Sequence, residues 1–482
     1  MVFDGRLVGA LLMWLAIIID HYTEIRREGP PGKCHPKAFR PSIHPVIYLS
    51  YLCVLIIMNI LSFGIREGVS LFLWQCLPVW IQISLYYCLL LPLLAVLRKQ
   101  ISPKACTKLW LLPNVLYILN CSGPLGYPNA PWLVLSVSKA LERILLPLWL
   151  AGFVTSFSWQ MADHFRIRKR LLSQSNLVLD SETLSIWEES QASIELDFPL
   201  RRLYRCRAVQ TPVSIGLAKK SICVLLPEKT YTAEELALIF RHELIHIKRK
   251  DCQCKLTLVF FTSLFWFNPL GILAKRRCSE DLELSCDESV LLGAAQDTRE
   301  KYARLLLRTA GEDRGFSTCL SASAKSLFYR LSNVLHPKKR SPGAVAAGFL
   351  CALLILSCGY ITVSYAHCSG SDVLFSKGDP SQFCLESITL EDSDREYMCS
   401  DEEALVQYLN QLRIHRLSGE YYHEESYWYK IMFTLPNGKI QISLSGHRIS
   451  VFGFHNGKAV ADTWYHDGQI DRAFLMGLLT DT

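Results

Sequence analysis

The sequence predicts a polytopic α-helical membrane protein with an inserted α+β domain and a small α+β domain at its C-terminal end. Half of the 482 residues are apolar, and the mean hydropathy is +0.19, which is rare for a soluble protein of this length. The apolar residues gather in long runs suited to spanning a bilayer, and basic residues cluster at the ends of these runs. Beyond the last run, polar and apolar residues alternate between turn signals, as in a half-buried sheet.

Six apolar stretches are the predicted membrane spans. The fourth is short and is interrupted by Pro113. The first has neither a basic segment before it nor a cleavage site of small residues, so we expect it to be retained rather than removed as a signal peptide. The six stretches are 5–20, 43–63, 70–97, 108–122, 132–157 and 343–366.

The distribution of basic residues predicts the orientation of these spans. Four basic clusters lie in residues 21–42, 98–108, 164–170 and 338–340. All four fall on one side of the membrane if six spans are present and the N-terminus is outside, and dropping any span breaks this pattern. The positive-inside rule therefore places residues 158–342 in the cytoplasm and residues 367–482 outside the cell.

Charge and cysteine content exclude some classes of function. The net charge of +7 is modest, and no basic run is interleaved with aromatic residues, so we expect no direct nucleic-acid binding. Many of the 18 cysteines lie in or beside apolar runs, where they are expected to be small buried residues. Cys384 and Cys399 are candidates for a disulfide in the outer segment, which would leave Cys368 over.

The outer segment is expected to form a small antiparallel sheet with one or two helices. Residues alternate from Tyr427 onward, and helical patterns cover 401–413 and 470–479. An aromatic group near the first strand is expected to be strand core rather than a ligand platform, and it comprises Tyr421, Tyr422, Tyr427, Trp428 and Tyr429. The expected hairpin turns are Asn437-Gly438, Asn456-Gly457 and Asp467-Gly468.

The inserted segment contains an amphipathic helix over residues 232–250. Thr232 and Glu235 match a capping box at its start. Apolar residues then recur at helical spacing, namely Leu236, Ile239, Phe240, Leu244 and Ile247. The capping box and the period predict a helix with one face buried in a protein core.

This helix carries the motif H-E-x-x-H. His242 and His246 are four residues apart, so both imidazoles project from one face and can bind one tetrahedral Zn²⁺. Glu243 can reach a water molecule at that ion and act as general base, then as proton donor to a leaving amine. A chance match to this motif in such a chain has odds of roughly one or two in a hundred, so we interpret it as a metal site.

A third ligand is expected from the helical pattern of residues 280–291. Glu283 and Asp287 are four residues apart on one face. We predict that Glu283 binds zinc and that Asp287 accepts a hydrogen bond from a ligand imidazole, which would fix the orientation of that ring. Glu280 and Glu288 remain alternatives, whereas Cys286 is interpreted as a small buried residue and the Cys252/Cys254 pair as weak evidence for metal.

Two neighbouring segments bear on this site. If residues 255–274 crossed the membrane, His246 and Glu283 would lie on opposite faces and could not share an ion. Asn268-Pro269 and Gly271 interrupt the stretch, so we expect a membrane-dipping hairpin or a buried core element. Residues 221–226 are predicted to be a buried or edge strand, and pairing of this strand with substrate backbone is the less favoured of the two hypotheses.

The combined motifs resemble the BlaR/MecR-type antirepressor family of membrane zinc metallopeptidases. The resemblance covers roughly residues 200–366 and is far more specific than H-E-x-x-H alone. The matching segments are QTPVSIGLAKKSICVLLP (210–227), RHELIHIKRKD (241–251), WFNPL (266–270), EDLELSCDESVL (280–291) and LSASAKSLFYRL (320–331).

The resemblance implies a site and a domain plan. Its site is gluzincin-like, with His242, His246 and Glu283 as zinc ligands and Glu243 as the base. The implied plan is an added N-terminal hairpin at 1–63, three helices at 64–157, a cytoplasmic zinc metallopeptidase domain at 158–342, a helix at 343–366 and an outer sensor at 367–482.

The outer segment departs from the best-known members of this family. Their outer domain is related to penicillin-binding proteins and senses a β-lactam. Residues 367–482 are too short for such a domain and contain neither S-x-x-K nor K-T-G. Ser136-x-x-Lys139 lies at the start of a predicted span and is interpreted as a chance match. The outer ligand and any link to drug resistance therefore stay open.

The expected function is cleavage of a cytoplasmic protein, such as a winged-helix repressor, on an outside signal. The expected partners are that substrate, the lipid bilayer and an unknown extracellular ligand, and a homodimer is left open. Two other hypotheses are a receptor or scaffold without turnover and a housekeeping membrane protease. The complete set of four site residues favours an active enzyme.

Overall fold

The fold is described from a computed structural model. Besides residues 15, 196, 198 and 200, it describes 45–117, 131–194, 202–309, 324–337, 340–341, 343–373, 384–390, 396–418, 429–435, 438–455 and 458–481. The chain divides into two compact units. The first comprises Met1–Leu55, Trp80–Ile118 and Leu150–Leu356, and the second comprises Ile56–Val79, Leu119–Trp149 and Ser357–Thr482.

Two of the described helices are long and apolar enough to cross a membrane. They are α3 (Ile65–Leu97) and α6 (Lys139–Ser173). Shorter apolar helices are present in α2 (Pro45–Phe63) and in α13 (Ala344–Ser357). These four helices coincide in position with four of the six predicted spans, whereas the span expected at 5–20 lies outside the described residues except for residue 15.

Three predicted spans differ from the structure in their helical extent. The described part of 108–122 is not one long helix, because α4 (Pro103–Leu111) is followed by the 3-10 turn η2 (Leu112–Val115). The span expected at 132–157 begins with strand β1 (Leu133–Ser136), and the one expected at 343–366 ends in strand β6 (Ile361–Ser369). β1 and β6 pair in parallel. A short apolar run looks the same in a strand as in a helix, so the boundaries were wrong.

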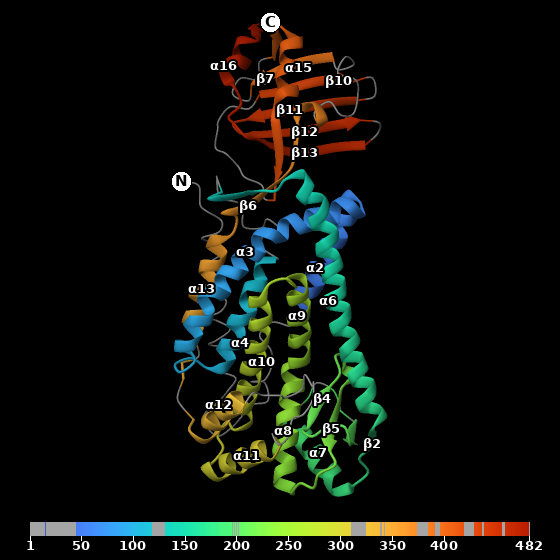
Figure 1. The fold of residues 1–482 in the computed structure, drawn as a ribbon, viewed down its shortest axis with the longest axis vertical. Coiled ribbons are helices and arrows are strands. Elements are labelled where there is room, and N and C mark those ends of the chain that lie inside the picture. The colour runs from blue at the N-terminus through green and yellow to red at the C-terminus, as the bar shows by residue number, and fades with distance from the viewer. Residues whose placement is uncertain are drawn as a thin grey trace. The chain divides into compact units, whose positions relative to one another are not determined.

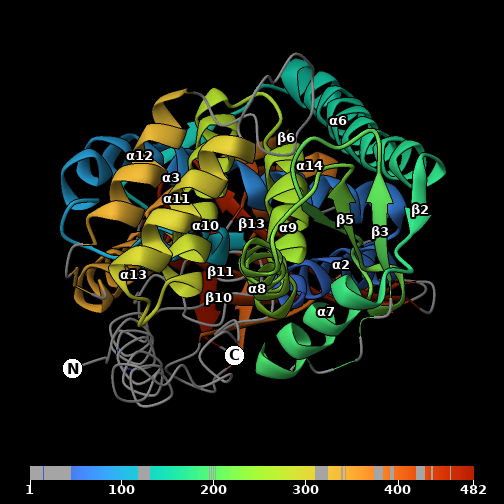
Figure 2. The same ribbon diagram turned by 90° about the horizontal axis from the view of Figure 1, so that it is seen from below.

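A four-stranded sheet and two helices form the scaffold of the inserted segment. The strand order is β2-β3-β5-β4, and Figure 2 shows this sheet beside α7 and α8. Trp187 of α7 packs edge-on against Phe240 of α8, with ring centroids 4.9 Å apart, inside the main core of this unit. The elements are β2 (Ser175–Leu177), α7 (Ser181–Ile194), β3 (Leu203–Cys206), β4 (Val213–Ile215), η3 (Lys219–Ser221), β5 (Cys223–Pro227) and α8 (Ala233–Arg249).

Strand β5 is an interior strand of this sheet. It pairs in parallel with β3 and antiparallel with β4, and all five of its residues are buried. Both of its hydrogen-bonding edges are therefore occupied, so the hypothesis that this strand pairs with substrate backbone is wrong. The two edge strands of the sheet are β2 and β4.

The apolar stretch after α8 forms a helical hairpin. α9 (Asp251–Leu264) and α10 (Pro269–Val290) pack side by side (Figure 1). Asn268 caps α10 by accepting a hydrogen bond from the Leu270 amide at 2.8 Å, and Pro269 occupies the first helical turn, where a missing N–H costs nothing. The chain thus turns back on itself between α9 and α10, in agreement with the expected hairpin. Two more helices follow, α11 (Gln296–Thr309) and α12 (Ala324–Leu335).

The C-terminal part is rich in β-strands. One sheet has the order β1-β6-β9-β13-β12-β11-β10-β7-β8-β14, and its central strands are stacked in Figure 1. Tyr429 is 5 % exposed in its core, whereas the other four residues of the expected aromatic group lie outside the described residues. The elements are α14 (Gly370–Val373), β7 (Cys384–Leu390), β8 (Glu396–Cys399), α15 (Glu402–Gln411), β9 (Arg413–Leu417), β10 (Tyr429–Leu435), β11 (Gly438–Ser445), β12 (Arg448–His455), β13 (Lys458–His466), α16 (Arg472–Gly477) and β14 (Leu479–Asp481).

Two of the three expected turns connect paired strands. β10 and β11 pair antiparallel on either side of the first expected turn, and β12 and β13 pair antiparallel on either side of the second. Asn437, Asn456 and Gly457 themselves lie outside the described residues. Asp467-Gly468 instead follows β13 and leads toward α16, so the third hairpin was wrong. Cys384 and Cys399, the candidates for a disulfide, are free thiols. The β7–β8 register, extended by two residues, puts Cys399 opposite Glu386 rather than Cys384.

Candidate metal centre

The centre is built on α8, whose ends explain its geometry. The predicted capping box is present: Thr232 Oγ1 accepts from the Glu235 amide at 3.2 Å, and Glu235 Oε2 accepts from the Thr232 amide at 2.9 Å. The helix ends at Lys250, a left-handed residue with φ +61°. This turn starts α9 at once and brings Asp251 back toward the last turn of α8.

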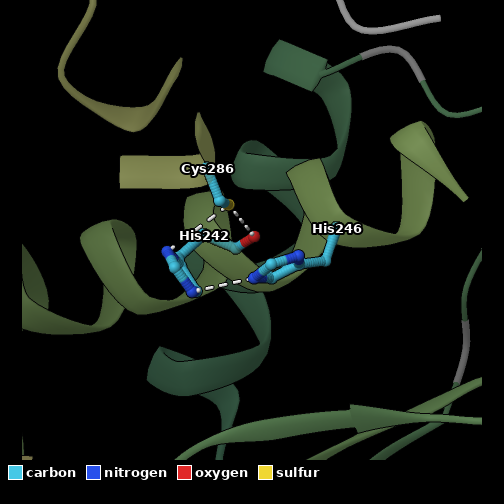
Figure 3. Close-up of side chains that lie close together, drawn as sticks. All are labelled: His242, His246 and Cys286. Carbon is cyan, nitrogen blue, oxygen red and sulfur yellow. Dashed lines mark hydrogen bonds between the residues drawn. The ribbon is translucent and has the colours of Figure 1, made fainter. Parts of the chain in front are cut away.

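Three ligand-type atoms converge between α8 and α10. His242 Nε2 lies 3.1 Å from His246 Nε2 (Figure 3), and Glu283 Oε2 lies 3.8 Å from the first and 3.5 Å from the second. Ligand atoms about 2.0–2.2 Å from a tetrahedral zinc ion lie about 3.3–3.6 Å apart. Glu283 Oε2 is also buried without a hydrogen-bond partner. These residues fit a zinc ion.

Asp251 orients one of the two imidazoles. His246 Nδ1 lies 2.7 Å from Asp251 Oδ2, and both residues are buried. A carboxylate can only accept, so the proton of His246 sits on Nδ1. The lone pair of Nε2 is then free to face the ligand position.

Tyr302 orients the other imidazole. Its hydroxyl donates to Asp287 Oδ1 at 2.7 Å, so it accepts from His242 Nδ1, which lies 2.9 Å away. Asp287 in turn accepts hydrogen bonds from Nε and Nη2 of Arg330, at 2.7 and 2.8 Å. The sequence predicted that Asp287 bonds an imidazole directly, but its carboxylate is 3.7 Å from His242 and acts through Tyr302.

Cys286 lies close to both imidazoles. Its Sγ is 3.5 Å from His242 Nδ1 (Figure 3), and the sulfur can form a metal-ligating group with His242 and His246. That Nδ1 atom already bonds Tyr302, however, whereas Glu283 Oε2 lies near both Nε2 atoms. We therefore favour Glu283 over Cys286 as the third ligand.

The charges at the centre prepare it for a cation. Burial opposes protonation of His242, but Cys286 and Glu283 outweigh it and raise the pKa of His242 to about 10. Burial would raise the pKa of Glu283, yet His246 and Lys255 hold that pKa well below its usual value. Glu283 therefore stays ionised, and metal binding at the imidazoles must release protons.

The remaining predicted residues are placed as follows. Glu243 follows His242 in α8 and is 4 % exposed. Glu280 pairs with Arg276 and Arg277, and Glu288 pairs with Arg340 at 2.9 Å. Both alternative carboxylates are thus engaged by arginines.

Sequence reasoning missed Asp251, Tyr302 and Arg330. Asp251 follows the zinc helix and lies within the matching segment at 241–251, so a search for a carboxylate just past the second histidine could have found it. Tyr302 and Arg330 come from α11 and α12, and no local pattern links them to the motif.

Comparison with known proteins agrees with this geometry. The profile of the BlaR1 peptidase M56 family matches residues 48–334, more than half of the chain. The regulatory protein BlaR1 of Bacillus licheniformis is 25% identical over 226 residues, which cover 46% of this chain and 37% of that protein. The methicillin resistance mecR1 protein of Staphylococcus aureus is 31% identical over 103 residues, which cover 21% of this chain and 17% of that protein.

The matches therefore cover well under half of either relative. The family profile includes α8, α9, α10 and most of α12, so every residue of the centre lies inside it. The chain belongs to the BlaR1 peptidase M56 family.

Proposed function

We propose that this chain is a membrane zinc endopeptidase that cleaves a cytoplasmic protein, such as a winged-helix repressor, in response to an extracellular signal. The observation that carries the proposal is the convergence of His242 Nε2, His246 Nε2 and Glu283 Oε2 within 3.8 Å of one another. Asp251 and Tyr302 hold the two imidazoles so that Nε2 faces inward.

Each residue then has a distinct task in peptide hydrolysis. A zinc ion held by His242, His246 and Glu283 would polarise the substrate carbonyl and make water more acidic. Glu243 accepts a proton from the attacking water and gives it to the leaving amine nitrogen. Substrate backbone can pair with β4, the edge strand that contacts α8.

The direction of signalling follows from the basic clusters. They favour a cytoplasmic peptidase segment and an outer β-rich C-terminal part. The outer part would bind the signal, and the inner part would cut the substrate. The names of the relatives, a regulatory protein and a resistance protein, support a regulatory role over general protein degradation.

The test is Glu243→Ala in the full chain. The variant should keep its zinc, because Glu243 is not a ligand, and should lose cleavage by at least about a hundredfold. Zinc is measured per purified chain. Cleavage is measured as new protein N-termini in cells that express the wild type or the variant, and on a co-expressed winged-helix repressor.

Glu234→Ala is the matched control, since Glu234 lies on the same helix and is exposed. It should keep both zinc and cleavage. A wild type without zinc, or new N-termini that persist in Glu243→Ala, contradicts enzymatic turnover and favours a receptor or scaffold.

A further inference from the structure

The C-terminal sheet brings together a second group of metal-ligating side chains, separate from the peptidase centre. His367 lies on β6, His415 on β9 and Asp467 directly after β13. One ligand atom from each lies within 4.8 Å of the other two. His415 Nδ1 is 2.9 Å from Asp467 Oδ1, and the His367 and His415 rings are 5.3 Å apart.

A β-bulge puts His367 in this group. The β6–β9 register runs from Tyr365 opposite Arg416 to Cys368 opposite Ile414, so Ala366 and His367 together oppose His415. Ala366 has φ +56°, and its amide donates to a Glu142 carboxylate oxygen at 2.6 Å. Such bulges re-aim side chains and recur beside functional sites.

Backbone contacts hold Asp467 in place. The His466 amide donates to the His447 carbonyl at 2.7 Å, and the Asp467 amide donates to the Arg413 carbonyl at 3.4 Å. The Nδ1 atoms of His447 and His466 lie 2.9 and 2.6 Å from the carbonyl oxygen of Gly468. The turn that carries Asp467 is thereby fixed against β9, the strand of His415.

His415 brings a buried ring nitrogen to this group. The residue is 8 % exposed, and its Nδ1 atom is buried without a partner in hydrogen-bond geometry, although Asp467 is close. A buried nitrogen without a well-aligned hydrogen bond is costly. A cation shared with the neighbouring carboxylate would satisfy both groups.

We propose that His367, His415 and Asp467 bind a divalent transition-metal ion of the zinc class in the C-terminal β-rich part. Two imidazoles and one carboxylate suit zinc, copper or nickel, whereas magnesium and calcium prefer oxygen ligands. Asp467 is more than half exposed, which leaves room for water as a further ligand. The ion would join β6, β9 and the end of β13.

The test counts zinc in the purified full chain after equilibration with excess zinc and removal of the unbound ion. The wild type should hold two zinc ions per chain, and His415→Ala and His246→Ala should each hold one. The double variant should hold none. His336→Ala, which changes an exposed histidine outside both groups, should hold two.

The outcomes separate this site from the peptidase centre. If the wild type holds one ion and only His415→Ala removes it, the site at His415 is supported and the peptidase centre is contradicted as a zinc site. The inference is overturned if His415→Ala still holds two ions. It is also overturned if the wild type holds one ion and only His246→Ala removes it. Asp467→Asn changes an exposed side chain, so it should reproduce the loss of one ion without disturbing the buried part of the sheet.

Discussion

At the scale of single residues, the centre depends on a carboxylate that holds no metal itself. Asp251 fixes the tautomer and the ring orientation of His246 through a 2.7 Å contact. Asp251→Asn keeps the shape but loses the charge, so we expect zinc affinity to fall about 10- to 100-fold. Competition with a chromophoric chelator measures this change.

Asp297→Asn serves as the control, because Asp297 is exposed and pairs with a partly exposed lysine. Its zinc affinity should equal that of the wild type. An unchanged affinity in Asp251→Asn would mean that the His246 ring is held by packing alone.

What could be predicted at this scale follows from helix geometry. His242, Glu243 and His246 share one helix, so spacing alone relates them, and Glu283 was found because it repeats that spacing with Asp287. Asp251 was missed because the left-handed Lys250 folds it back, and a left-handed lysine has no sequence signature.

At the scale of elements, Arg330 ties α12 to the helix that carries Glu283. It forms a two-point ion pair with Asp287, and both residues are nearly fully buried. Arg330→Met leaves a buried unpaired carboxylate, so we expect unfolding free energy to drop by about 3–5 kcal/mol. Zinc affinity should also fall, because Asp287 no longer holds Tyr302 in place.

The double variant Arg330→Met/Asp287→Leu distinguishes these two effects. Removing both charges should restore much of the stability, whereas zinc affinity should stay low because Tyr302 lacks its acceptor. Thermal unfolding and chelator competition on the purified chain give the two readouts. Arg304→Met, at an exposed ion pair, should change neither, and a double variant with full zinc affinity would rule out the Tyr302 link.

Helices and turns were predicted well where the signal lies within a few residues. They were predicted poorly where a strand pairs with a segment far away in the sequence. The capping box of α8 and the turn before α10 were found because Thr232, Glu235 and Asn268-Pro269 act within a few residues. The ends of two predicted spans were wrong because β1 and β6 pair with each other from distant parts of the chain. An apolar run does not reveal such a partner.

At the scale of the whole molecule, the crossing of α13 decides on which side the β-rich part lies. α13 has 14 residues, which at about 1.5 Å per residue is about 21 Å. The bilayer core is about 30 Å thick. The helix alone is therefore short for a span, yet the cluster at 338–340 requires a crossing after it if the positive-inside rule holds.

Alkaline phosphatase fusions test this crossing, since the reporter is active only outside the cytoplasm. A fusion after residue 342 precedes α13 and should be inactive, and a fusion after residue 482 should be active. Green fluorescent protein at the same two positions should give the reciprocal pattern, which controls for expression. Two inactive phosphatase fusions would mean that α13 does not cross, and that His367, His415 and Asp467 face the cytoplasm together with the peptidase.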